Sequence, residues 1–244
     1  MRKSISDKPG ETLDTLFQGR LKLLQKKAGY RFSIDAPLLA HFCEPRPRDR
    51  IIDLGTGCGV IPLILIHRKK AEKVTGVEIQ PTLADLARRN AALNRASTRI
   101  KIWQKDLRNL EKGKARFDLV VCNPPYRKAG SGRVNPRLEK ALARHEINAT
   151  LQDVLRTAHS LLPARGRLFL IYPAPRAAEL IHEMRRFHLE PKRLQFVHSS
   201  LKGDARLLLV EAVKEGRPET RVLPTFYLFN AAGKYTPEAE ELFL

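Results

Sequence analysis

The feature that most constrains this chain is an apolar run that ends at two consecutive prolines. Residues 117–122 read Phe-Asp-Leu-Val-Val-Cys and are followed by Asn123-Pro124-Pro125-Tyr126. Such a run is typical of a buried parallel strand, and the strand must end at Asn123 because proline has no N–H to donate. The element is either an ordinary turn or a ligand grip at the carboxyl end of a strand. The second interpretation predicts binding of a planar group that carries an NH2.

Strands and helices alternate along the rest of the chain. We predict further strands over residues 50–54, 74–79, 100–105, 166–172, 194–197 and 207–213. Helical patterns separate most of them, over residues 81–93, 151–162 and 177–187. Strands that alternate with helices pair into a parallel, doubly wound sheet. The sequence therefore predicts an α/β fold of the Rossmann-like kind.

We expect three segments along the chain. They are an N-terminal extension over residues 1–32, the main domain over 33–223 and a tail over 224–244. Residues 1–12 are expected to fray, and strands over 20–25 and 30–33 are expected to form a hairpin around a glycine-containing turn. The tail carries Phe-Tyr-Leu-Phe at 226–229, which would promote aggregation if exposed. We therefore expect the tail to pack on the domain.

A glycine-rich loop follows the strand over residues 50–54. It contains Gly55, Gly57 and Gly59, and the acid Asp53 precedes it. Glycines let a backbone approach a ligand closely, but this spacing differs from the G-x-G-x-x-G of dinucleotide sites. An acid at this place would repel a pyrophosphate and attract an ammonium. The loop therefore favours S-adenosylmethionine, whose methionine moiety carries an ammonium group.

Two more acids follow the next two predicted strands. Glu78, about twenty residues on, can accept hydrogen bonds from ribose hydroxyls, and Asp106 could receive an adenine amino group. Each acid alone could be a turn residue or a helix cap, but acids at three successive strand ends are harder to explain in that way. The candidate cofactor residues are Asp53, Gly55, Gly57, Gly59, Glu78, Ile79, Asp106, Leu107 and Asn123.

The charge of the chain indicates a polyanionic partner. It has 45 Lys and Arg against 26 Asp and Glu, a formal net charge of +19, and nucleic acid is the first expectation for such an excess, ahead of a membrane. The segment after Tyr126 is rich in basic residues that could neutralise an RNA backbone, although a solvated loop would look the same. The candidate nucleic-acid contacts are Arg127, Lys128, Arg133, Arg137, Arg144 and His145.

Cysteine and histidine patterns favour neither disulfides nor a metal. Cys43, Cys58 and Cys122 form no C-x-x-C pair, and the seven histidines show no metal-ligand spacing. We therefore expect a reducing compartment, the cytoplasm, and no metal. Residues 1–14 are too polar for a signal peptide, and the longest apolar stretch, 60–66, is too short to span a bilayer.

With these residues in place, the chain resembles class I S-adenosylmethionine-dependent methyltransferases of the Asn-Pro-Pro-Tyr type. It looks closest to the bacterial valine-tRNA adenine N6-methyltransferases, which modify the adenine beside the anticodon. The resemblance extends to Gly-Tyr-Arg-Phe-Ser-Ile-Asp-Ala-Pro-Leu-Leu-Ala at 29–40, to Asn-Pro at 135–136 with Ala-Arg-His-Glu at 143–146, and to Gly-Lys-Tyr-Thr-Pro-Glu at 233–238. One departure is Arg127, because that position is often aromatic in the family.

The resemblance implies a fold, a reaction and roles. The fold is a mostly parallel seven-stranded sheet whose last strand is antiparallel, and the reaction is N6-methylation of a tRNA adenine. The side-chain oxygen of Asn123 and the carbonyl of Pro124 would each accept one N–H of the adenine amine. Tyr126 would stack on the flipped base. The candidate catalytic residues are thus Asn123, Pro124, Pro125 and Tyr126.

Three other functions remain open at this stage. An Asn-Pro-Pro-Tyr site serves any planar NH2, so glutamine N5-methylation of a release factor is one alternative, and amino methylation of ribosomal RNA or DNA is another. The third is an RNA-binding protein with a degenerate methyltransferase fold. The basic charge and the segment 143–146 argue against the release factor, and the intact acids argue against a degenerate fold.

Overall fold

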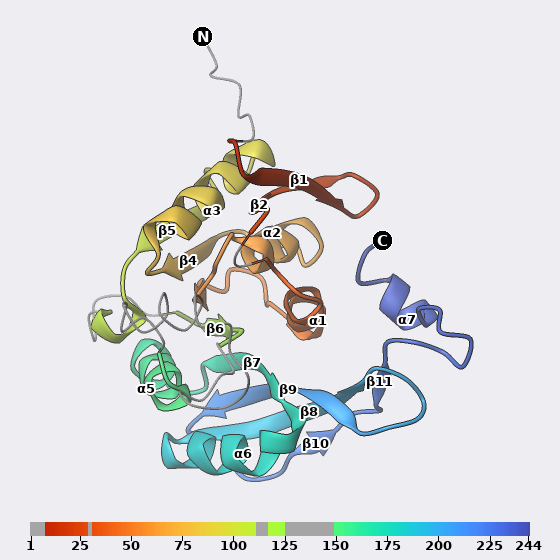
Figure 1. The fold of residues 1–244 in the computed structure, drawn as a ribbon. Helices are drawn as coiled ribbons and strands as arrows, with labels where there is room; N and C mark the ends of the chain where they lie inside the picture. The colour runs from red at the N-terminus through yellow and green to blue at the C-terminus, as the bar shows by residue number, and fades with distance from the viewer. Residues whose placement is uncertain (1–7, 29–30, 111–116, 125–148) are drawn as a thin grey trace, which may run out of the picture.

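The computed structural model describes residues 8–28, 31–110, 117–124 and 149–244. At its centre lie seven long strands. They are β3 (Ile51–Leu54), β4 (Val74–Glu78), β5 (Ile100–Gln104), β6 (Leu119–Cys122), β7 (Arg167–Pro173), β8 (Leu189–His198) and β9 (Ala205–Lys214). Across the sheet the order is β5-β4-β3-β6-β7-β9-β8, and of these seven β9 is antiparallel to its neighbours. The predicted α/β sheet, mostly parallel with an antiparallel last long strand, is confirmed (Figure 1).

Two short strands extend the sheet beyond β8. β10 (Arg221–Val222) and β11 (Phe226–Tyr227) each pair with β8 in parallel, so the sheet has nine strands within the described ranges. The sequence did not predict these two, because a two-residue strand has no alternation to recognise. The pairing sets Tyr227 opposite His198, at the carboxyl end of β8.

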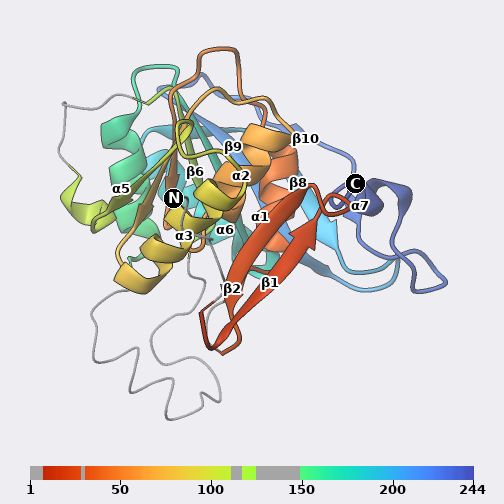
Figure 2. The same ribbon diagram turned by 90° about the horizontal axis from the view of Figure 1, so that it is seen from above.

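Helices cover both faces of the sheet. On one face lie α1 (Asp35–Phe42), α2 (Val60–His67) and α3 (Pro81–Leu93), and on the other α5 (Leu151–Leu161) and α6 (Ala177–Arg186) (Figure 1, Figure 2). In β7, Phe169 and Ile171 are buried with the first group, and Leu168 and Leu170 with the second, because side chains along a strand alternate between its faces. Burial on both faces is why such strands read as continuous apolar runs.

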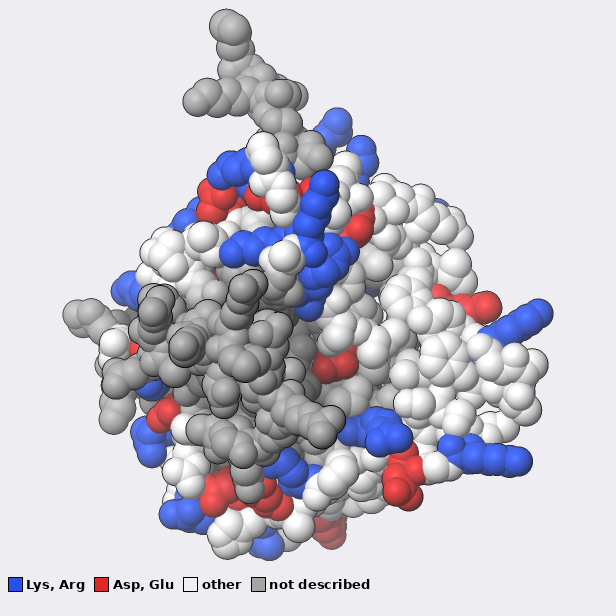
Figure 3. Space-filling model, viewed as in Figure 1, with Lys and Arg blue, Asp and Glu red and all other residues white. Residues whose placement is uncertain are grey.

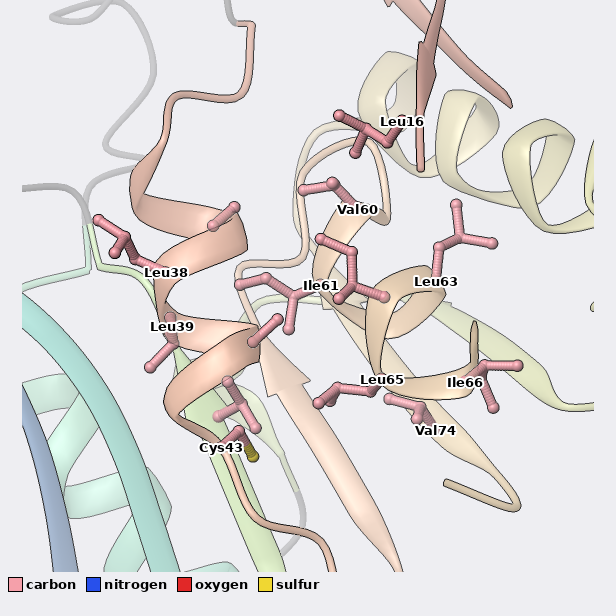
Figure 4. Close-up of a cluster of buried hydrophobic side chains, with 14 of the residues drawn as sticks. Leu16, Leu38, Leu39, Cys43, Val60, Ile61, Leu63, Leu65, Ile66 and Val74 are labelled. Atoms are coloured by element: carbon pink, nitrogen blue, oxygen red, sulfur yellow. The ribbon is translucent and has the colours of Figure 1, made fainter. Parts of the chain in front are cut away.

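Helix α2 is apolar on all sides. Every residue from Val60 to Ile66 is buried, and a helix of this kind must be enclosed. Figure 4 shows α1 beside α2, and Leu16 at the end of the first strand close to Val60 at the start of α2. The N-terminal strands thus help to cover a helix that the sheet and α1 leave partly open.

These N-terminal strands form a hairpin that lies one strand earlier than predicted. β1 (Glu11–Leu16) pairs antiparallel with β2 (Leu21–Lys26). The expected strand over 20–25 therefore matches β2, but the expected partner over 30–33 is wrong, since residues 31–33 lie outside any strand. The first residues of β1 were expected to fray and instead pair with the end of β2.

The physical reason for this error is the turn. It spans 17–20, where Phe17 and Gln18 both have φ of 54° and Gly19 has φ of 82°. Left-handed values are uncommon for residues other than glycine, so a Phe-Gln pair gives no signal of a turn. Phe17 adopts this conformation while its side chain is buried, so packing overrides local preference.

The tail packs against the end of the sheet beside β8. Phe226, Leu228 and Leu242 are buried, and Thr236 caps the short helix α7 (Pro237–Glu240) by accepting the N–H of Ala239 at 3.1 Å. The aromatic residues at the start of the tail are therefore largely enclosed, and aggregation through them is suppressed.

A buried ion pair joins β7 to the connection between α1 and β3. Arg167, the first residue of β7, is 5% exposed. Its guanidinium donates to Asp49 Oδ2 at 2.6 Å and to the backbone oxygen of Glu44 at 2.7 Å. A second carboxylate, that of Glu211 on β9, lies 3.9 Å away. These contacts hold the amino-terminal edge of the sheet.

The substitution Arg167→Met should lower the free energy of unfolding by about 3 kcal/mol, because it leaves the largely buried Asp49 carboxylate without its ion-pair partner. The matched control is Arg50→Met. Arg50 pairs with Asp118 at 3.2 Å, but the two side chains are 58% and 37% exposed, so we expect a loss of about 1 kcal/mol or less. Urea unfolding measures both, and equal losses would contradict the role given to burial.

Candidate active site

The carboxyl ends of four neighbouring strands form one polar edge of the sheet. β3 pairs in parallel with β4 and with β6, and β4 pairs in parallel with β5. Asp53 lies in β3, Glu78 ends β4, Asp106 follows β5 and Asn123 follows β6. Since parallel strands end at the same edge, the structure brings these four predicted site residues to one edge of the sheet, where open α/β sheets bind ligands.

Asp53 is a buried acid whose oxygens have no hydrogen-bond partner within the described part of the chain. Its exposure is 0%, and neither Oδ1 nor Oδ2 is paired. Burial raises the pKa of Asp53 to about 7; the Thr56 hydroxyl acts in the opposite direction, and the Glu78 carboxylate raises the pKa further. A buried polar group without a hydrogen-bond partner lowers the stability of the fold. The presence of Asp53 at this place therefore calls for an explanation.

A cationic ligand supplies that explanation. An ammonium brought to this edge would favour ionised Asp53 and would donate the hydrogen bonds that its oxygens lack. The methionine moiety of S-adenosylmethionine carries such a group, so the acceptors at this place fit that cofactor. The unpartnered oxygens of Asp53 are the observation on which this fit depends.

Glu78 shapes the glycine loop as well as facing the site. Its Oε2 accepts the N–H of Gly57 at 2.9 Å, and its Oε1 accepts the N–H of Gln80 at 2.8 Å. Burial raises the pKa of Glu78, and these backbone donors oppose the rise. Each carboxylate oxygen can accept more than one hydrogen bond. The side chain can therefore hold the loop and still accept a ribose hydroxyl.

The three loop glycines all have left-handed φ, 76° at Gly55, 57° at Gly57 and 83° at Gly59. Beside Gly55 there is open space, since a Cβ there would meet no atom within 4 Å. At Gly59 a Cβ would lie 3.2 Å from the Cβ of Ala87, so this end of the loop rests on α3. The backbone is thus open to a ligand at one end and packed at the other.

Asp106 is already engaged by a neighbour. It precedes the 3-10 helix η1 (Leu107–Asn109), and its carboxylate accepts the backbone N–H of Arg108 at 2.9 Å and the guanidinium at 2.6–3.0 Å. The Arg108 hydrogen bonds lower the pKa of Asp106 against the effect of burial. An adenine amino group at this carboxylate would share it with Arg108 or displace that partly exposed side chain. The half-buried Ile79 and Leu107 lie beside the two acids in sequence.

Asn123 and Pro124 are the described part of the tetrapeptide. Asn123 is half-buried and Pro124 is buried. The end of β6 is aligned with that of β3, where the Cys122 thiol donates to the backbone oxygen of Leu54 at 3.2 Å. The other predicted catalytic and nucleic-acid residues lie outside the described residues; they are Pro125, Tyr126, Arg127, Lys128, Arg133, Arg137, Arg144 and His145.

One buried polar residue next to the glycine loop was not predicted from the sequence. Asn90 of α3 is 0% exposed and donates from Nδ2 to the backbone oxygen of Cys58 at 2.9 Å. The available signal was its place on the apolar face of an amphipathic helix, four residues before a second asparagine. A polar residue at such a position requires a partner.

The described segments show no candidate metal cluster and no helix that could span a membrane. They contain no group of three or more His, Cys, Asp or Glu side chains placed to hold a metal ion. Nor do they contain a helix with the length and hydropathy needed to cross a bilayer.

The fold and the site together define a class of protein. The sheet is mostly parallel with one antiparallel long strand, a glycine loop follows β3, and acids lie at the ends of the next strands. These are the features of class I S-adenosylmethionine-dependent methyltransferases. The prediction of an S-adenosylmethionine-dependent enzyme is confirmed at the level of the class by the family model and the relatives described next.

The family model of the methyltransferase small domain matches residues 33–188. A Porphyromonas gingivalis protein named tRNA1(Val) (adenine(37)-N6)-methyltransferase is 33% identical over 233 residues, which cover 90% of this chain and 89% of that protein. The chain therefore belongs to the methyltransferase small domain family, with the tRNA1(Val) (adenine(37)-N6)-methyltransferases among its relatives. The resemblance that the sequence suggested is thus confirmed.

Solved structures agree with this assignment. The Agrobacterium tumefaciens protein Atu636, described as a predicted O-methyltransferase, matches with a TM-score of 0.68 and 26% identity over 85% of this chain and 94% of that one. P. horikoshii TYW2 in complex with MeSAdo matches with a TM-score of 0.60 and 16% identity over 86% and 73% of the two chains. The second likeness shows the fold alone.

The raised pKa of Asp53 predicts a pH dependence of stability. The folded pKa of about 7 exceeds the ordinary 3.8, so the folded state binds more protons between these values. The stability contributed by Asp53 therefore falls as pH rises through this window. Relative to the variant Asp53→Asn, the ligand-free protein should lose about 2–3 kcal/mol of unfolding free energy between about pH 5 and pH 8.

Urea unfolding of both proteins across this pH range measures the difference. Other titrating groups, Glu78 among them, are common to the two proteins and largely cancel. Parallel pH profiles would show that Asp53 is not destabilised by burial.

Proposed function

We propose that this chain transfers the methyl group of S-adenosylmethionine to N6 of an adenine in tRNA, at the position beside the anticodon of a valine tRNA. The observation that carries the proposal is the position of Asn123 at the end of β6, adjacent to the end of β3 that bears the glycine loop. The choice of substrate is supported by the name of the Porphyromonas gingivalis relative, tRNA1(Val) (adenine(37)-N6)-methyltransferase. A tRNA-modifying enzyme of this kind would act in the cytoplasm.

Asn123 and Pro124 supply two hydrogen-bond acceptors for an exocyclic amine. The lone pair of the adenine amine is conjugated with the ring, so the amine is a poor nucleophile. The side-chain oxygen of Asn123 and the carbonyl of Pro124 would each accept one N–H, which favours a more pyramidal nitrogen and aims its lone pair. S-adenosylmethionine supplies an electrophilic methyl group on sulfur. The N–C bond forms as the S–C bond breaks, and the N6 proton then passes to solvent.

Positioning and electrostatics are therefore the contributions of the protein. Tyr126 would stack on the flipped base, a contact worth about 1–3 kcal/mol. On this proposal the cofactor is held by the acids and glycines named above together with Ile79, Leu107 and Asn123. The tRNA backbone would be met by Arg127, Lys128, Arg133, Arg137, Arg144 and His145.

The charge of the chain supports an RNA substrate over a protein substrate. The formal net charge is +19, and affinity for a polyphosphate backbone rises with the number of Lys and Arg contacts. Figure 3 shows the face of the molecule that is turned to the viewer in Figure 1. Lys and Arg side chains are spread over this face, with Asp and Glu side chains between them. The described part of this face thus holds mixed charges rather than a block of one sign.

The substitution Asn123→Ala should reduce kcat by about 100-fold or more, because it removes an acceptor that acts on the reacting amine. The Kd for S-adenosylmethionine should change by no more than about threefold, because the acids and the glycine loop remain. The control is Asn109→Ala in η1, an exposed asparagine that should leave both constants unchanged. Unchanged turnover in Asn123→Ala would refute the assignment.

The substrate is tested by methyl transfer from radiolabelled S-adenosylmethionine to unmodified total tRNA. A release factor and duplex DNA serve as parallel acceptors. Label recovered as N6-methyladenosine in tRNA, and absent from tRNA that lacks the valine isoacceptor, is the expected result. Label in the release factor alone would refute the tRNA assignment and would leave the role of Asn123 toward an amide NH2 intact.

A further inference from the structure

Asn90 joins three parts of the molecule through one buried side chain. Its Oδ1 accepts the N–H of Leu24 in β2 at 2.7 Å, and its Nδ2 donates to the backbone oxygen of Leu24 at 3.0 Å and to that of Cys58 at 2.9 Å. Both N–H groups of the amide therefore donate a hydrogen bond, and the residue is 0% exposed. One side chain thus connects the hairpin, α3 and the glycine loop.

Asn94, which follows α3 as its C-cap, makes the same contact with the hairpin and not with the loop. Its Oδ1 accepts the N–H of Lys22 at 2.9 Å, and its Nδ2 donates to the backbone oxygen of Lys22 at 2.6 Å. The two asparagines take the place of a neighbouring strand along the free edge of β2, since they pair with alternate residues as a strand does. The second N–H of the Asn94 amide donates to the backbone oxygen of Asn90 at 2.8 Å.

The loop is fixed on both sides of Cys58. Glu78 accepts the N–H of Gly57 at 2.9 Å, and Gly59 rests against Ala87, which is three residues before Asn90 on α3. The Asn90 contact to the Cys58 oxygen lies between these two supports. Because the same Asn90 amide also bonds Leu24 of β2, this contact joins the loop to the hairpin as well as to α3.

We propose that Asn90 is a positioning residue for the cofactor loop and that it couples the N-terminal hairpin to S-adenosylmethionine binding. The carbonyl of Cys58 is held by an amide that the hairpin also orients, so the loop keeps its ligand-ready backbone only while the hairpin is docked. Asn94 anchors the same hairpin without touching the loop. The inference goes beyond the choice of methyl acceptor, since it concerns the cofactor alone.

The test compares Asn90→Ala with Asn94→Ala. Both variants lose two hydrogen bonds to β2, and Asn90→Ala also frees the Cys58 oxygen. Calorimetric titration with S-adenosylhomocysteine should give a Kd about 5- to 10-fold higher than wild type for Asn90→Ala, as expected for one lost buried hydrogen bond. Asn94→Ala should stay within about twofold. Equal changes in the two variants would overturn the proposal.

A second measurement uses the wild-type protein and so does not depend on the folding of a variant. Coupling between two sites is reciprocal, so saturation with S-adenosylhomocysteine should slow amide hydrogen exchange at Leu24 more than at Lys22, whose N–H is bonded to Asn94. Equal protection at the two amides, or none, would show that the hairpin is not coupled to the loop. Neither measurement involves a methyl acceptor, so their failure would leave the proposed tRNA substrate untouched.

Discussion

The parallel pairing of β3 with β4 and with β6 is the constraint on which the rest of the structure depends. It brings the ends of β3 to β6 to a single edge, and it buries the strands on both faces so that polar chemistry is confined to their ends. Asp53 is the exception, since it lies within β3 and is fully buried. Burial raises the pKa of Asp53, so keeping its ionised carboxylate beside the glycine loop costs folding free energy. At the opposite edge, Arg167 contacts two largely buried carboxylates and a backbone oxygen, which stabilise the sheet.

At the end toward α2, the glycine loop packs against α3. Gly59 can lie against Ala87 only because neither residue has a large side chain, and its left-handed φ would strain any other residue. In its middle, at Gly57 and Cys58, the loop is held by polar contacts from Glu78 and Asn90. Both supports leave Gly55 open. The loop is therefore rigid where it joins the helices and accessible where a cofactor would lie.

Much of the fold and part of the site could be predicted from the sequence. Apolar runs marked the long strands, and their last residues marked Asp53, Glu78, Asp106 and Asn123. The pairing of Asp106 with Arg108 could not be predicted, because side-chain rotamers decide it. Asn90 was missed because its contacts are to backbone atoms 66 and 32 residues away. The hairpin was misplaced because its turn is set by burial of Phe17 in a left-handed conformation rather than by turn residues.

The docking of β2 on α3 has a consequence for synthesis of the chain. The hairpin leaves the ribosome early, but the asparagines that bond its free edge follow 66 and 72 residues later. Until then the apolar side of β2, with Leu21 and Leu23, has no surface to cover it, and an uncovered two-stranded hairpin is marginal in water. The hairpin therefore has no surface to dock on until β3, α2 and α3 have been made. Its docking then covers α2 and, through Asn90, joins the hairpin to the cofactor loop.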